Sequence, residues 1–433
     1  MSASAISRVR ARRVFDSRGR PTVEGEVELA GGALGRAIAP AGASRGAREA
    51  VDLRDGGIRF GGFDVSRAIA NVDGPIARLL LGRDAFDQAA VDRALIDADG
   101  TSDKSRFGGN ATVAVSLAVA HAAANAQQMP LWQSMAFKGP IALPLPEIQI
   151  FGGGAHAGRR LDIQDLMVMP IGADSFSEAL AMSAAVYRAA GMLMQEAGRF
   201  AGVADEGGYW PLFDSNEDAL TMLVRAIERA GLHPGVDVAL SLDIAASELY
   251  RDGRYRLTLD RALLDAERMA HLLLGWLDRF PIASIEDPFA EDDTAAWIDF
   301  TAAAGARVQI VGDDLLTTDA ARVATAVADR ACNAVLIKPN QAGTVTEARA
   351  ALDAGKRADF GTIVSARSGE SEDTSIAHLA VGWNAGQIKV GSFARGERTA
   401  KWNELLRIEE TLGPRTSYAG GAPLRRPATS PVR

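Results

Sequence analysis

The chain has 433 residues, of which 47% are hydrophobic and 24% charged, and its formal net charge at pH 7 is −8. This acidic balance argues against a nucleic-acid-binding protein, because such proteins usually carry an excess of basic residues. No run of about 18 apolar residues is present, so we expect no membrane span. The single cysteine, Cys332, excludes an intrachain disulfide and fits a reducing compartment, and we therefore expect a cytoplasmic protein.

The N-terminal part of the chain shows two successive patterns. Apolar and polar residues alternate from residue 5 to about 40, as in TVEGEVELA, which predicts the strands of a meander. Helical periodicity follows from about residue 64 to 130, with Ala-rich stretches. These patterns predict an N-terminal α+β domain over residues 1–135. The Pro-rich segment GPIALPLPE (139–147) is predicted to be the linker that follows it.

Short apolar runs alternate with helix-length stretches in the rest of the chain. This alternation predicts a parallel sheet, and the number of runs favours closure into an α/β barrel over residues 140–413. Residues 414–433 are rich in Pro, Gly and Arg and are predicted to be a flexible tail. The runs are DLMVMPIG (165–172), DVALSLD (237–243), IASIED (282–287), VQIVGDD (308–314), AVLIKPN (334–340), GTIVSAR (361–367) and GQIKVGS (386–392).

Acidic residues stand at the ends of three successive runs: Asp243, then Glu286 and Asp287, then Asp313 and Asp314. Active sites of such barrels lie at the carboxyl ends of the strands, so we expect these side chains to meet at one rim. A single acid after a strand is as often a helix N-cap as a ligand. Three in succession favour a metal site, and carboxylate oxygens are the ligands that Mg²⁺ prefers.

Lysine is rare in this chain, with only six lysines among 47 basic residues, yet Lys338 and Lys389 each end a short apolar run. A buried ammonium group can lose its proton and act as a base, whereas a guanidinium stays protonated. Both lysines are therefore candidates for catalysis, although lysines at the edge of a core would give the same spacing. Together with Arg367, they predict a cationic rim that faces the acids and binds a small anionic substrate.

Ten motifs follow one another within residues 8–412: DSRGRPTVEGEV (16–27), GASRGAREAVDLRDG (42–56), DIQDLM (162–167), ADEGGYWP (204–211), SLDIAASELY (241–250), SIEDP (284–288), GDDLLTT (312–318), LIKPNQAGT (336–344), RSGESEDT (367–374) and GQIKVGS (386–392). In this order they resemble the enolase family. The resemblance implies an N-terminal α+β domain joined to an eightfold barrel whose first strands and helices run in an unusual order. It also implies interconversion of 2-phosphoglycerate and phosphoenolpyruvate with Mg²⁺, in a cytoplasmic homodimer or higher oligomer.

The resemblance implies roles for the residues that match the motifs. The expected metal ligands are Asp243, Glu286 and Asp313 for a first Mg²⁺ and Ser44 for a second. Lys338 is expected to take the proton from C2 of the substrate, and Glu206 to assist departure of the C3 hydroxyl. Nearby cations are expected to lower the pKa of Lys338 toward neutrality.

The resemblance implies five further residues around the substrate. Lys389 is expected to pair with the substrate carboxylate and the charge on the metal. Arg367 and Ser368 are expected to bind the phosphate. His156 and Gln164 match residues that lie against the substrate.

The chain departs from the family pattern at several positions around the same site. Asp165 stands in DIQDL where the family has Glu, and it remains a candidate catalytic residue with a side chain one methylene shorter. Ala366 stands where the family has His before the phosphate-binding Arg-Ser pair. Arg45, Arg159 and Arg160 add guanidinium groups in loops near the expected mouth, where they could bind phosphate, phosphonate or carboxylate.

These departures leave three hypotheses. The first is an enolase paralogue diverted to a related enolate reaction, with carboxyphosphonoenolpyruvate synthesis in phosphonate (phosphinothricin-type) biosynthesis as the named candidate. The alternative is an ordinary glycolytic enolase that tolerates the substitutions. The third is a non-catalytic binding relative, against which the intact acids and lysines argue.

Overall fold

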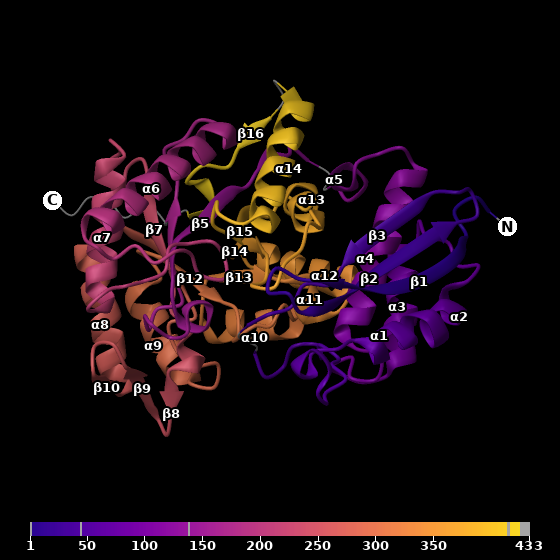
Figure 1. Cartoon of the computed structure of the whole chain (residues 1–433), viewed down its shortest axis with the longest axis horizontal. Coiled ribbons are helices and arrows are strands. Elements are labelled where there is room, and N and C mark those ends of the chain that lie inside the picture. Colours follow the sequence, from indigo (N-terminus) through magenta and orange to yellow (C-terminus); the bar gives the residue numbers. More distant parts are fainter. Residues whose placement is uncertain (1, 44–45, 137–138, 414–415, 425–433) are drawn as a thin grey trace.

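The computed structural model describes residues 2–43, 46–136, 139–413 and 416–424. In Figure 1 the N-terminal sheet and its helices form the right-hand part of the molecule, and the barrel with its surrounding helices forms the left-hand part. The predicted architecture, an N-terminal α+β part followed by an eightfold α/β barrel, is confirmed.

The N-terminal part is built on an antiparallel meander in which β1 (Ile6–Phe15), β2 (Pro21–Leu29) and β3 (Leu34–Ile38) pair in order. Helix α4 (Gly109–Ala126) packs on β2 and β3 with almost every residue buried. The contact is close because Gly35 faces the helix: a Cβ there would lie 2.1 Å from the carbonyl oxygen of Ala118. The other helices of this part are α1 (Ser66–Asn71), α2 (Ala77–Leu80), α3 (Gln88–Asp99) and α5 (Leu131–Ser134).

The barrel closes in the order β11-β12-β13-β14-β15-β5-β6-β7. Its strands are β5 (Leu145–Gly152), β6 (Asp165–Met169), β7 (Ala239–Asp243), β11 (Ile282–Glu286), β12 (Gln309–Gly312), β13 (Ala334–Ile337), β14 (Gly361–Ser365) and β15 (Gly386–Gly391). Neighbouring strands are parallel, except that β6 runs antiparallel to both β5 and β7. All seven predicted runs form barrel strands.

The eighth strand, β5, lies partly in the Pro-rich segment that was predicted to be a linker. Pro146 is inside this strand and is paired with Ile388 of β15, next to an irregularity in the register of the two strands. A proline has no N–H to donate to a sheet, so a strand is not normally predicted around one.

Helices alternate with these strands and cover the barrel. Several begin at a side chain that accepts a hydrogen bond from the first turn, such as Ser175 from the amide of Glu178 and Thr344 from that of Glu347. The helices are α6 (Phe176–Glu196), α7 (Asn216–Arg229), α8 (Ala266–Arg279), α9 (Thr294–Ala304), α10 (Ala320–Asp329), α11 (Pro339–Ala342), α12 (Val345–Arg357), α13 (Ser375–Gly382) and α14 (Gly396–Leu412). A small antiparallel sheet of β8 (Tyr250–Arg251), β9 (Arg254–Leu257) and β10 (Ala262–Leu264) follows β7.

Residues 416–424, which were predicted to belong to a flexible tail, lie against the barrel instead. β16 (Ser417–Tyr418) pairs in parallel with β4 (Ala142–Leu143), and the hydroxyl of Tyr418 donates to the carbonyl of Pro170 at 3.1 Å. Composition alone did not reveal these contacts, because they join residues far apart in the sequence. Among the described helices, none combines the length and apolar character that crossing a bilayer requires.

Loops of the N-terminal part reach the carboxyl ends of the barrel strands. The backbones of Ala41 and Gly369 form a β-bridge, and the amide of Ile38 donates to the Asp373 carboxylate at 2.8 Å. The hydroxyl of Ser17 donates to the carbonyl of Ser368 at 3.2 Å. These contacts place N-terminal residues at the mouth of the barrel.

Candidate active site

A small, polar pocket lies at the carboxyl ends of the barrel strands. It is lined by Gly42, Ala43, His156, Gln164, Asp165, Glu206, Asp243, Lys338, Ser365, Ala366, Arg367, Ser368, Lys389 and Val390. Nine of the residues predicted from the sequence to act in catalysis, substrate binding or metal binding are in this lining. Strands on opposite sides of the barrel contribute them, which is why residues so distant in sequence meet.

Asp243 and Glu286 end β7 and β11, and Asp313 directly follows β12. All three are at most 7% exposed. The ammonium group of Lys389 lies 2.9 Å from Asp243 Oδ2 and 2.7 Å from Glu286 Oε2. The positive charge of Lys389 thereby reduces the free-energy cost of burying the carboxylates of Asp243 and Glu286.

The three acids fit Mg²⁺ by their chemistry, because they offer only oxygen atoms. Glu286 Oε1 is buried and has no hydrogen-bond partner among the described residues. Burial, the nearby charge of Asp243 and other charges raise the pKa of Glu286 well above its usual range. A divalent cation would favour the ionised form and take up the unused oxygen.

Asp287 has a supporting position that the sequence did not reveal. Its two carboxylate oxygens accept the backbone amides of Asp313 and Asp314, each at 2.9 Å. Asp287, Asp313 and Asp314 also form one of two buried groups of described residues whose ligand atoms could meet at a metal ion. Since the oxygens of Asp287 already hold the turn after β12, this residue positions Asp313.

Lys338 directly follows β13 and its ammonium group donates to Asp313 Oδ2. Burial, the largest effect, lowers the pKa of Lys338, but the charges of Asp313 and Glu286 together raise it and the net direction is upward. Neighbouring cations act in the expected direction, but among the groups of the protein they do not decide the sign of the shift. Arg367 and Lys389 do lower it, but each acts less strongly than Asp313.

His156 joins the two carboxylates of Asp165 and Glu206. Its Nδ1 lies 2.9 Å from Asp165 Oδ1, and its Nε2 lies 3.7 Å from Glu206 Oε1. Burial lowers the pKa of His156, but the two carboxylates raise it to about 9. The imidazole, Lys389 and a hydrogen bond from Gln149 hold the pKa of Asp165 well below its usual range, against the effect of burial.

Arg367 follows β14 and forms a two-point ion pair with Glu49 of the N-terminal part. Nη1 lies 2.8 Å from Oε2, and Nη2 lies 3.2 Å from Oε1. Glu49 also accepts the amide of Gly46 at 3.0 Å. The buried guanidinium of Arg398 donates to the carbonyls of Arg367 and Ser368 at 2.7 and 2.5 Å and fixes their loop.

Sequence reasoning missed both Glu49 and Arg398. Glu49 lies within a motif that was recognised, but a single acid in a loop gives no sign of its partner. Arg398 lies inside α14 with no exposed area, and an arginine in an Arg-rich chain is not conspicuous.

The remaining candidates lie elsewhere. Ser44 and Arg45 fall outside the described residues. Arg159 lines a neighbouring cavity, where it pairs with Glu248, and Arg160 lines neither this cavity nor the catalytic pocket. Ala366 is in the catalytic lining, where its methyl group offers no hydrogen-bond donor.

Comparison with known families agrees with this geometry over nearly the whole chain. Residues 6–135 match the family model "Enolase, N-terminal domain". Residues 140–426 match the model "Enolase, C-terminal TIM barrel domain", which alone covers more than half of the sequence. With both domains present in the family's order, the chain belongs to the enolase family.

Proposed function

We propose that this protein is a Mg²⁺-dependent lyase that interconverts 2-phosphoglycerate and phosphoenolpyruvate. The observation that supports this most strongly is that Lys338 and Glu206 line one small pocket together with the carboxylate Asp243, Lys389 and Arg367. A base and an acid are thereby available to the same bound molecule.

The reaction breaks two bonds and forms one double bond. Lys338 accepts the proton from C2, and the electron pair left behind forms the C2–C3 double bond. The C3–oxygen bond breaks, and Glu206 supplies the proton with which the hydroxyl leaves as water. Since Lys338 contacts Asp313, loss of its proton requires that this carboxylate be compensated in another way.

The substrate is an anion that gains further negative charge during the reaction, so a metal site is needed beside it. Asp243, Glu286 and Asp313 would hold Mg²⁺, with Ser44 assisting a second ion. When bound, the metal stabilises the extra negative charge that develops on the carboxylate as C2 loses its proton.

The other residues of the pocket bind and orient the substrate. Lys389 faces the carboxylate, while Arg367 and Ser368 bind the phosphate. His156 and Gln164 line the same pocket and hold the substrate between these groups.

A diverted enolate reaction, such as carboxyphosphonoenolpyruvate synthesis, is the second candidate. It is favoured by Ala366, which brings no donor to the lining, and by Asp165, whose short carboxylate is already bonded to His156 and Gln149. Both substitutions alter substrate handling and leave the acids and lysines in place.

The test is phosphoenolpyruvate formation from 2-phosphoglycerate by purified protein with Mg²⁺, followed by absorbance. A turnover of about 10 s⁻¹ or more, ordinary for an enzyme, is expected for an enolase. Slow dehydration together with rapid proton exchange at C2 would favour the second candidate. Absence of both activities would overturn the proposed chemistry.

A further inference from the structure

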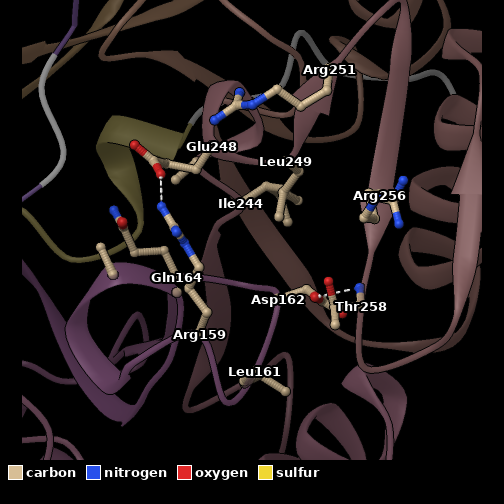
Figure 2. Close-up of a pocket in the computed structure, with 13 residues that line it drawn as sticks. Arg159, Leu161, Asp162, Gln164, Ile244, Glu248, Leu249, Arg251, Arg256 and Thr258 are labelled. Atoms are coloured by element: carbon tan, nitrogen blue, oxygen red, sulfur yellow. Dashed lines mark hydrogen bonds and ion pairs between the residues drawn. The ribbon is translucent and has the colours of Figure 1, made fainter.

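A second cavity lies beside the catalytic pocket, between loop residues 154–164 and the segment 244–258 (Figure 2). Gln164 lines both spaces and forms part of the wall between them. The second cavity measures about 130 Å³, compared with about 20 Å³ for the catalytic pocket. A ligand in it would therefore lie next to the substrate without occupying the substrate's position.

One of the two acids in this lining, Asp162, is already saturated. It is 6% exposed and accepts the amides of Thr258 and Leu259 at 2.7 and 3.1 Å. The side-chain amide of Asn216 donates to it at 2.9 Å. Asp162 thus holds the backbone that forms the cavity wall and has little capacity to neutralise a cation.

With Asp162 saturated, the lining has three arginines and one other acid, Glu248. Arg159 pairs with Glu248, as the dashed line in Figure 2 shows. Arg251 and Arg256 have no carboxylate partner in the described part of the chain; Arg251 donates only to backbone carbonyls. Two guanidinium groups are therefore available to an anion, and guanidinium geometry suits phosphate and phosphonate.

The centre of the same cavity is apolar. Figure 2 shows Ile244 and Leu249 in the middle of the lining, with arginines around them. Leu161 and Ile244 are almost completely buried. Leu249, which is half-buried, therefore presents the apolar surface, and an anion carried on an apolar body would cover it whereas an inorganic anion would not.

We propose that this cavity is a subsite for an organic phosphate or phosphonate that binds beside the small substrate, held by Arg251 and Arg256 over an apolar floor. This inference goes beyond the proposed function, because dehydration of 2-phosphoglycerate needs no second ligand in the neighbouring cavity. It assigns to the two arginines a role that sequence reasoning gave to Arg45, Arg159 and Arg160.

Phenyl phosphate is a suitable probe, because it carries a dianion on an apolar ring. We expect it to bind the full chain, in the presence of Mg²⁺, at least tenfold more tightly than inorganic phosphate in isothermal titration calorimetry. Arg251→Gln and Arg256→Gln should each weaken this binding about tenfold, as expected for loss of one charge-assisted hydrogen bond.

Arg254→Gln is the matched control. Arg254 lies on β9 with Arg256 and is also exposed, but it is outside the cavity lining. Loss of affinity in this control equal to that of Arg256→Gln would reveal unspecific attraction and overturn the subsite. Binding that ignores both cavity arginines, or inorganic phosphate binding as tightly as phenyl phosphate, would also overturn it.

Proton exchange at C2 of 2-phosphoglycerate should be measured on the same unmodified protein. Exchange without binding of phenyl phosphate would overturn the subsite and leave the proposed function in place. Binding without exchange would support the subsite and count against the proposed function alone.

Discussion

Two halves of the candidate active site hold their buried charges in different ways. In the acid–lysine half, defined by Asp243, Glu286, Asp313, Lys338 and Lys389, every strand-end acid contacts an ammonium group or can reach a metal. All five residues of this half match positions to which the resemblance to enolases assigns a role.

The recognition half, defined by His156, Asp165, Ala366 and Arg367, depends on other pairings. Asp165 is bonded to His156, and Arg367 to Glu49. Two of these four positions depart from the family pattern. On the proposed function, enolate formation would fall to the first half and substrate choice to the second, with Lys389 and Asp165 in contact at 3.4 Å where the two halves meet.

Lys338 gives the largest expected effect. Lys338→Ala should slow proton exchange at C2 by about 1,000-fold, within the range that general-base catalysis contributes. The measurement is hydrogen–deuterium exchange of 2-phosphoglycerate followed by NMR. Lys338→Arg is the control, because it keeps a cation beside Asp313 but cannot act as a base.

Rapid exchange in the arginine variant would remove Lys338 as the base and leave it as a counter-charge. Circular dichroism of both variants checks the fold, since an unpaired Asp313 is costly when buried.

The recognition half is tested by restoring the family pattern. Asp165→Glu combined with Ala366→His should raise the rate of 2-phosphoglycerate dehydration by up to about 100-fold, the cost of a misplacement of about 1 Å. The longer carboxylate reaches further, and the imidazole adds a donor beside Arg367. Absorbance at steady state measures the gain.

An unchanged rate in the double variant would mean that these departures do not limit dehydration. Substrate choice would then be set by loops outside the catalytic lining. A gain without any change in proton exchange would show that the two halves are independent.

The acid–lysine half is tested through its metal affinity. Glu286→Gln should weaken Mg²⁺ binding by at least about tenfold. Removing a residue that merely supports a metal ligand already costs about tenfold, and removal of a ligand should cost no less. The measurement is a Mg²⁺ titration by calorimetry. Glu228→Gln removes a carboxylate from the exposed face of α7, away from the expected ligands, and should leave the affinity unchanged.

Most of the barrel was predictable because buried parallel strands are continuous apolar runs that end in polar residues. The convergence of Asp243, Glu286 and Asp313 followed from topology alone. Strand β5 was missed because Pro146 lies within it.

The pairing of buried charges could not be predicted in the same way. Arg367 and Glu49 are 318 residues apart in the sequence, and their contact depends on how the N-terminal part docks on the barrel. The direction of the Lys338 pKa also depends on how closely Asp313 and Glu286 approach the ammonium group, which spacing does not reveal.

The smallest expected effect is the pH dependence that His156 gives to stability. Its pKa is about 9 in the folded protein, compared with about 6.5 in an unfolded chain. The charged imidazole therefore stabilises the fold fully below pH 6.5, and this contribution is lost as the pH rises through about 9. Asp165→Asn removes the carboxylate that raises the pKa most, so the decline between these pH values should become shallower.

Urea denaturation at several pH values measures the free energy of unfolding, and its slope against pH between 6.5 and 9 is compared for the unmodified protein and Asp165→Asn. Asp237→Asn is the matched control, because Asp237 pairs with a histidine that is 80% exposed, and it should leave the slope unchanged. An equal slope in the Asp165 variant and the unmodified protein would show that Asp165 does not hold the charge of His156. The positive charge of His156 would then have to be balanced by Glu206, the other carboxylate near that ring.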